Sequence, residues 1–189
     1  MWSINNYRLW NKLDKNVEVK HLCLGGQKLM VLASLSGLPN LETIDLSHAH
    51  GLLLGKAIEN LKSLKTLDIS HYLVGIPVYD SSLQINRFPS SLTHLNLSHT
   101  TLGISEKYIS FEHLCNLHTL NLSHTDIESF PKCPESLQVL DVSSNSIKES
   151  CICLSKSQIA VISKLKTLVI HGNIGISIPK EIPLCILLF

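Results

Sequence analysis

The amino-acid sequence predicts an α/β solenoid with a parallel β-sheet on its concave face and short helical, 3-10 or extended segments on its convex face. Three observations support this fold class. One six-residue pattern recurs seven times, the copies start 20 to 28 residues apart, and the alternation inside each copy is that of a short strand. Such a period is typical of chains that stack one small structural unit.

The recurring pattern is apolar-x-x-apolar-x-apolar, and its clearest copies are LTHLNLSHT at 92–100 and LHTLNLSHT at 117–125. All 21 apolar positions are Leu, Ile or Val. Side chains at positions four and six should point into the core, while those at positions three and five should face solvent. The copies start near residues 19, 41, 64, 92, 117, 137 and 165.

One copy cannot fold alone. Burying three aliphatic side chains returns about 1.5–3 kcal/mol each, whereas ordering the backbone costs about 1–2 kcal/mol per residue. Neighbouring copies must therefore bury their apolar rows against each other. The expected organisation is an N-terminal cap over 1–18, a repeat domain over 19–180 and an apolar C-terminal end over 181–189.

The segments between the strands must return the chain along the convex side. GKAIENLKSL at 55–64 predicts a short helix, while IESFPKCPESL at 127–137, with two prolines, predicts an extended or 3-10 segment. The longer returns at 72–91 and 145–164 predict irregular protrusions or binding loops.

The pattern resembles the leucine-rich-repeat family, whose core consensus is L-x-x-L-x-L-x-x-N/C-x-L, over residues 17–180. In that family the Asn at position nine hydrogen-bonds the backbone of its loop, and here only Asn145 and Asn173 match it. Thr100 and Thr125 can replace it only in part, so less regular loops are expected. The resemblance also implies an interaction module that binds a protein or peptide partner, rather than an enzyme.

Reading equivalent positions across the repeats gives the candidate contact residues. Position eight carries His48, His71, His99 and His124, which should form a row at the strand edge. Two interpretations stay open: a polar turn copied by repeat duplication, or a functional row that binds a metal or titrates together near pH 6. Metal binding is disfavoured because a straight row does not converge on one centre. The candidates are Asp45, His48, Asp68, His71, Tyr72, His94, Asn96, His99, Asn121, His124 and Asp141.

Tyr72 is the expected single anchor for a partner, because aromatic side chains dominate binding energetics. A catalytic set built from Ser98, His99 and Asp45 or Asp68 is not expected, because adjacent strand residues diverge and no glycine-rich nucleophile turn is present. No cofactor is expected. The six cysteines are expected to be mostly buried free thiols.

Composition limits the partners. A net charge of +1, from 16 Lys and Arg against 15 Asp and Glu, gives no footprint for nucleic acid. The longest apolar run, IPLCILLF, has eight residues and is too short to insert in a membrane, although self-association through this C-terminal edge is expected. The first residues show no secretory signal, so an intracellular, cytoplasmic protein is expected.

Two alternatives remain. A receptor-type extracellular recognition domain is suggested by Cys151-Ile-Cys153, which resembles the cysteine spacing of extracellular leucine-rich-repeat caps. A substrate-recognition adaptor of a ubiquitin-ligase assembly is the other, although the 18 residues before the first repeat are too few for a recruiting segment.

Overall fold

The computed structural model describes residues 18–26, 28–29, 35–51, 58–72, 83–102, 109–148, 154–173 and 187–188. The cap expected over 1–18 therefore lies outside the described residues except for Glu18, and the apolar end over 181–189 is described only at 187–188.

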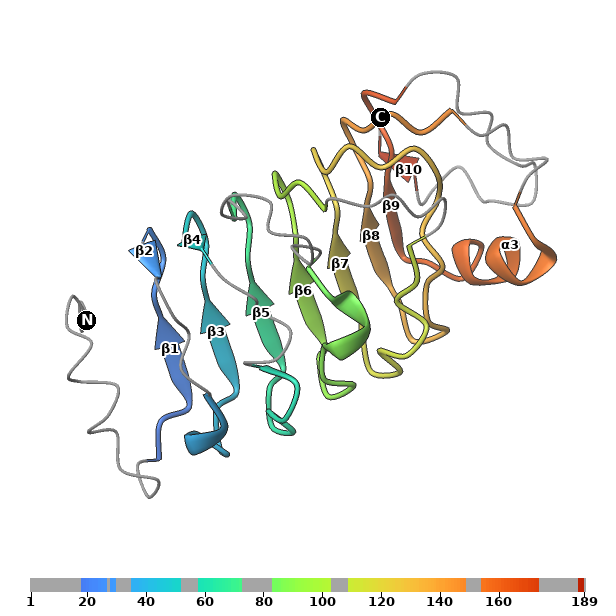
Figure 1. The fold of residues 1–189 in the computed structure, drawn as a ribbon. Coiled ribbons are helices and arrows are strands. Elements are labelled where there is room, and N and C mark those ends of the chain that lie inside the picture. The colour runs from blue at the N-terminus through green and yellow to red at the C-terminus, as the bar shows by residue number, and fades with distance from the viewer. Residues whose placement is uncertain are drawn as a thin grey trace.

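Eight parallel strands form one sheet in chain order, which confirms the predicted fold class (Figure 1). Each predicted strand occupies positions three to five of its repeat, and these positions pair with each other, as in Thr66↔His94. The first seven strands are β1 (His21–Cys23), β3 (Thr43–Asp45), β5 (Thr66–Asp68), β6 (His94–Asn96), β7 (Thr119–Asn121), β8 (Val139–Asp141) and β9 (Thr167–Val169).

An eighth strand, β10 (Leu187–Leu188), extends the sheet beyond the seven predicted copies. It pairs with β9 so that Leu187 lies opposite Leu168, an inward position of its repeat. The sequence LCILLF at 184–189 has the same apolar spacing as the other copies. The apolar C-terminal end thus contains a strand, which could have been predicted from this apolar spacing.

The core lies between the sheet and the return segments. Positions one, four and six are buried in every described repeat except for the half-buried Val19. Aromatic side chains from three returns close the other side of this core, namely Phe88, Phe111 and Phe130, each no more than 4% exposed. This packing is what a solenoid needs, because each repeat buries its apolar face only against its neighbours.

The returns are short and varied. They contain η1 (Leu35–Gly37), η2 (Ile85–Arg87) and the helix α3 (Lys156–Ile162), while β2 (Lys28–Leu29) and β4 (His50–Gly51) form a small parallel sheet beyond β1 and β3. Segment 127–137, predicted to be extended or 3-10, contains a turn at 135–136, and its Lys132 forms an isolated parallel bridge with Ser110.

The return at 145–164 differs from the irregular loop that was predicted, because its described end is the helix α3. Ser155 caps this helix: its hydroxyl accepts the Gln158 N–H at 3.2 Å, and the Gln158 side chain accepts the Ser155 N–H at 3.0 Å. This reciprocal capping box stabilises the first turn. The start of the helix expected over 55–64, and residues 73–82 of the other long return, lie outside the described residues.

Position nine lies beneath the turn and ties neighbouring repeats together. The Asn145 amide donates to the carbonyls of Leu122, Val142 and Ser143, and its oxygen accepts the N–H groups of Thr125 and Ile127. In the earlier repeat Thr100 makes only two such contacts, donating to the Ile69 carbonyl and accepting the Tyr72 N–H. The partial replacement of Asn by Thr is therefore confirmed.

Candidate functional site

The turn after the strand is closed by the Asp or Asn side chain at position five in the five central repeats. In five repeats its oxygen accepts the backbone N–H of the residue two positions later, with N···O distances of 2.8 to 3.1 Å. Such bonds let Asp and Asn fix a turn that follows a strand. The acceptors are Asp45, Asp68, Asn96, Asn121 and Asp141, all of which were candidate contact residues.

Position eight of every repeat has the left-handed backbone conformation. The φ angles run from 52° to 71° at Gly26, His48, His71, His99, His124, Ser144 and Gly172. Histidine is among the few residues other than glycine that this region accepts. Each of these residues up to Ser144 donates its N–H to the position-seven carbonyl of the next repeat, at 2.7 to 3.1 Å. The backbone of the turn is therefore translated from repeat to repeat.

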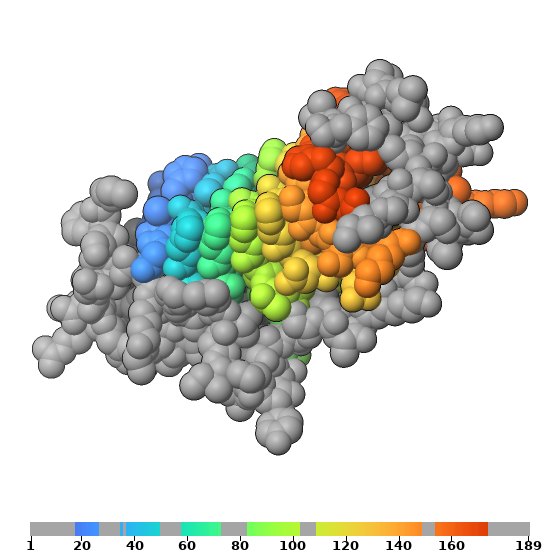
Figure 2. Space-filling view, turned by 90° about the horizontal axis from the view of Figure 1, so that it is seen from above, coloured from blue at the N-terminus to red at the C-terminus, as the bar shows by residue number. Residues whose placement is uncertain are grey.

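This translation stacks the four histidine rings, which we call the histidine row: His48, His71, His99 and His124. Successive ring centroids lie 4.2, 4.1 and 4.1 Å apart, and the rings are nearly parallel, with interplanar angles of 10°, 8° and 12°. His71 is half-buried and the other three are exposed. Figure 2 views this carboxyl edge of the sheet from above, where the repeats lie side by side in chain order.

The row disfavours protonation of neighbouring rings. Slight burial, followed by the charges of His124, His71 and His48, holds the pKa of His99 below its usual value. Two unit charges about 4 Å apart repel by about 1 kcal/mol even in bulk water, and by more beside a low-dielectric surface. The repulsion halves at twice the distance, so protons on alternate rings are favoured over protons on adjacent rings.

A carboxylate lies near the start of the row. Burial alone would raise the pKa of Asp45, but hydrogen bonds from Ser47 and Cys23, together with the charge of His48, hold it below its usual value. Asp45 is thus ionised across the range in which the imidazoles titrate.

The solvent side of the sheet, which we call the strand face, carries the side chains of positions three and five. His94 is exposed there, and its ring lies 2.9 Å from the Thr93 hydroxyl. The Asn96 amide donates to the Asp68 carboxylate at 3.0 Å, so position five also links β5 to β6 through a side-chain hydrogen bond. The strand face is polar and regular, but its Asp and Asn side chains are partly engaged by their own turns.

Tyr72 does not lie on this surface. Its side chain is 1% exposed, and burial raises its pKa to about 12. Position nine points under the turn into the core, as the 0% exposure of Ala49 and Thr100 also shows. The prediction of Tyr72 as a partner anchor is therefore wrong, and its burial shows that it stabilises the repeat instead.

Among the described residues, no three His, Cys, Asp or Glu side chains are arranged to hold a metal ion. Ser98, the candidate nucleophile of the disfavoured catalytic set, is 8% exposed, and its N–H is used by the Asn96 turn. Cys23, Cys115 and Cys133 are free thiols, but only Cys133 is buried, so the expectation of burial is wrong for the other two. Burial raises the pKa of Cys133 to about 12. The other three cysteines lie outside the described residues.

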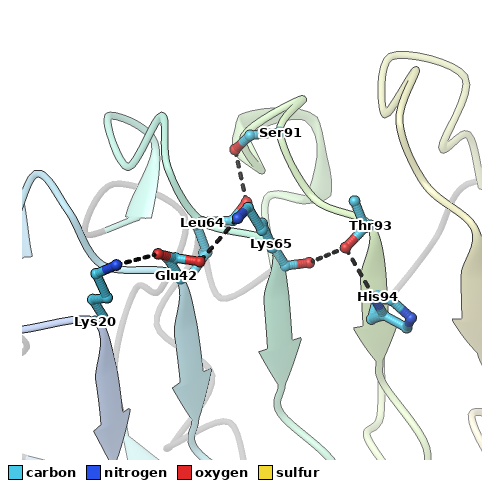
Figure 3. A network of polar contacts seen from close by, with 7 residues as sticks. All are labelled: Lys20, Glu42, Leu64, Lys65, Ser91, Thr93 and His94. Carbon is cyan, nitrogen blue, oxygen red and sulfur yellow. Dashed lines mark hydrogen bonds and ion pairs between the residues drawn. The ribbon is translucent and has the colours of Figure 1, made fainter.

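The amino edge of the sheet carries a charged row that sequence reasoning missed. Glu42 lies between Lys20 at 3.3 Å and Lys65 at 2.9 Å, as Figure 3 shows. Hydrogen bonds from Lys65 and then Lys20 lower the pKa of Glu42. These residues occupy position two of three successive repeats, so reading that position down the repeats would have revealed the alternation of charge.

Comparison with known proteins agrees with the repeat architecture. No protein-family model matches the chain. It is 29% identical over 172 residues to the disease resistance protein RML1A of Arabidopsis thaliana, covering 76% of this chain and 16% of that protein. A leucine-rich-repeat protein of Leptospira interrogans superimposes with a TM-score of 0.56 at 26% identity, over 78% of this chain and 35% of that one. The chain has the leucine-rich-repeat fold.

Two further proteins are similar to this chain. Fibromodulin of Gallus gallus is 26% identical over 174 residues, covering 81% of this chain and 46% of fibromodulin. An internalin of Listeria monocytogenes, at 14% identity and a TM-score of 0.53, covers 85% of this chain and half of its own and supports the fold alone. The chain spans less than half the length of the relatives it matches by sequence. No helix in the described part of the chain is long and apolar enough to cross a membrane.

Proposed function

We propose that this leucine-rich-repeat protein is a protein–protein interaction module that holds a protein or peptide partner against the strand face and the adjoining histidine row. One observation carries this proposal: strands β1 to β9 of the main sheet present their position-three and position-five side chains in register on a single face. Repetition of this kind builds an extended binding surface.

The contact residues proposed are those on or beside this face, with Tyr72 removed because it is buried. The exposed residues His48, His94, His99 and His124 have the best access to a partner. Binding rather than catalysis is the activity proposed, because the extended, regular strand face is the feature that supports the proposal. A cytoplasmic setting and self-association through the C-terminal edge stay predictions.

The proposal is tested by blocking the strand face without touching the turns. Thr66 and Thr119 lie at position three on β5 and β7 and are half-buried between neighbouring side chains. Changing both to Arg places two bulky cations on the face. Glu135→Arg is the matched control, because it adds the same side chain at an exposed position on a return segment.

Affinity capture from lysate, followed by measurement of the captured partner's dissociation constant, gives the readout. We expect the wild-type chain and Glu135→Arg to hold the same partner and Thr66→Arg/Thr119→Arg to lose it while melting at an unchanged temperature. A partner held equally by all three proteins would exclude the strand face as its binding surface.

A further inference from the structure

The histidine row has a geometry that the turn alone does not require. Position eight needs the left-handed conformation, and Gly26, Ser144 and Gly172 satisfy it as well as the histidines do. Four consecutive repeats nevertheless carry imidazoles, with ring centroids 4.1 to 4.2 Å apart. Imidazole is the side chain whose ordinary charge change falls between about pH 5 and 8. The row is thus an array of titratable rings at a single edge.

The stacking sets how protons enter the array. Adjacent rings repel when both are charged, whereas alternate rings lie about twice as far apart. Two protons on the row therefore avoid adjacent rings. Acidification through the range in which imidazole ordinarily changes charge adds positive charge to this edge of the sheet.

The charged groups around the row do not cancel this change. The carboxylates of Asp45, Asp68 and Asp141 each accept the N–H that closes their own turn, and these hydrogen bonds hold the three side chains in place. Asp126 is exposed two residues after His124. The remaining titratable residues of the neighbouring elements are Lys28 of β2, His50 of β4 and His171, which follows β9.

We propose that the histidine row is a proton-gated docking edge for an acidic, extended segment of a partner protein, closed near pH 7.5 and open near pH 5.5. This inference rests on the proposed function and names the chemistry of the partner. An extended segment with Glu or Asp at every second residue repeats its carboxylates about every 6.6–6.8 Å. This repeat is shorter than the separation of alternate rings, which is twice the centroid spacing of 4.1–4.2 Å, so the rotatable acidic side chains have to take up the difference. Glu stays ionised near pH 5.5, so acidification charges the row without neutralising the segment.

The test uses the full chain and a fluorescein-labelled peptide with alternating Glu and Ser, followed by fluorescence anisotropy at both pH values in low salt. His71→Asn/His99→Asn is the informative variant, because it interrupts the row twice and Asn also accepts the left-handed conformation. His118→Asn is the matched control, because it removes a half-buried imidazole at position two of its repeat, on the amino edge of the sheet and outside both the row and the strand face. A Gln-Ser peptide and a single-stranded oligonucleotide complete the design.

We expect the wild type and His118→Asn to bind the Glu-Ser peptide about tenfold more tightly at pH 5.5 than at pH 7.5, and the double variant to lose this difference. Equal affinity at both pH values, or an equal loss in His118→Asn, would overturn the proposal. So would equal binding of the Gln-Ser peptide or of the oligonucleotide, because either would remove the preference for an acidic protein segment.

A second measurement does not depend on any peptide. Titration of the imidazole C–H signals by NMR should show the four row histidines protonating in two steps. A single common step would refute the inference that protons on adjacent rings repel each other. If the affinity for the Glu-Ser peptide does not depend on pH but the strand face still captures a partner, this inference is refuted and the proposed function is kept. If no partner is captured but the affinity for the peptide depends on pH, the proposed function is refuted and this inference is kept.

Discussion

Asn145→Ala should destabilise the protein strongly. We expect it to cost more than the removal of any other hydrogen-bonded side chain in the described part of the chain, whether that side chain lies on the surface or beneath a turn. Asn145 is 6% exposed and satisfies three carbonyls and two N–H groups of two neighbouring repeats. Asn145→Ala leaves several of these buried groups without partners, and each such group costs about 1–3 kcal/mol. Because the neighbouring groups relax together, we expect a total of about 3–4 kcal/mol.

Urea unfolding followed by circular dichroism measures this cost, provided that the slope of the transition is unchanged. For a chain of this size, about 3 kcal/mol corresponds to a melting temperature lower by about 6–12 °C. Asn116→Ala is the control, because Asn116 is exposed and makes one side-chain hydrogen bond, to the Ser90 carbonyl at 2.9 Å. If Asn145→Ala lost less than about 1 kcal/mol, or no more than Asn116→Ala, the role assigned to position nine would be refuted.

Three further outcomes are expected. Gly172→Ala should destabilise by more than about 1 kcal/mol in urea unfolding, because φ is +71° and the new Cβ would lie 3.0–3.2 Å from Ser144 atoms. The lowered pKa of His99 means that the unfolded chain binds more protons near pH 6, so stability should fall as pH drops below about 6.5, and His99→Asn should reduce that fall in parallel unfolding curves at pH 7.5 and 5. Lys65→Ala should leave the urea midpoint unchanged, because its bridge to Glu42 is exposed.

The strands of the main sheet could be predicted because the residues that determine them are close together in the sequence. An aliphatic residue at positions four and six fixes which face of a strand is buried, and parallel copies then pair at equivalent positions, as Leu67 does with Leu95. The returns could not be predicted with the same accuracy, since their lengths vary and their packing depends on contacts with other repeats. The helix α3 was nevertheless marked in the sequence by Ser155 and Gln158, the two residues of its capping box.

The repeat pattern predicted where the candidate residues lie along each strand and turn, but it did not predict the direction of every side chain. The sequence predicted that four histidines lie in one row. It did not predict that their rings stack, because stacking depends on the backbone conformation at position eight and not only on the spacing between neighbouring strands. Tyr72 was predicted to be exposed because it is an aromatic residue that follows a polar turn. Position nine, which it occupies, also carries Ala49, Thr100 and Asn145 in other repeats. The small size of Ala49 and the loop-binding role of Asn145 indicated that this position is buried.

The turn and the stack are separable properties of the same four residues. Glycine fits the left-handed conformation at position eight of the first and last repeats, and serine fits it at Ser144, so the backbone does not select imidazole. A single histidine in one repeat would gain nothing from its neighbours, because stacking needs rings at equivalent positions of adjacent repeats. Duplication of one repeat supplies such neighbours at once, since the turn geometry is copied together with the sequence. A proton-sensitive edge can therefore arise from a residue that the turn accepts but does not require. Whether this edge binds a partner in a pH-dependent way depends on the charge of the partner.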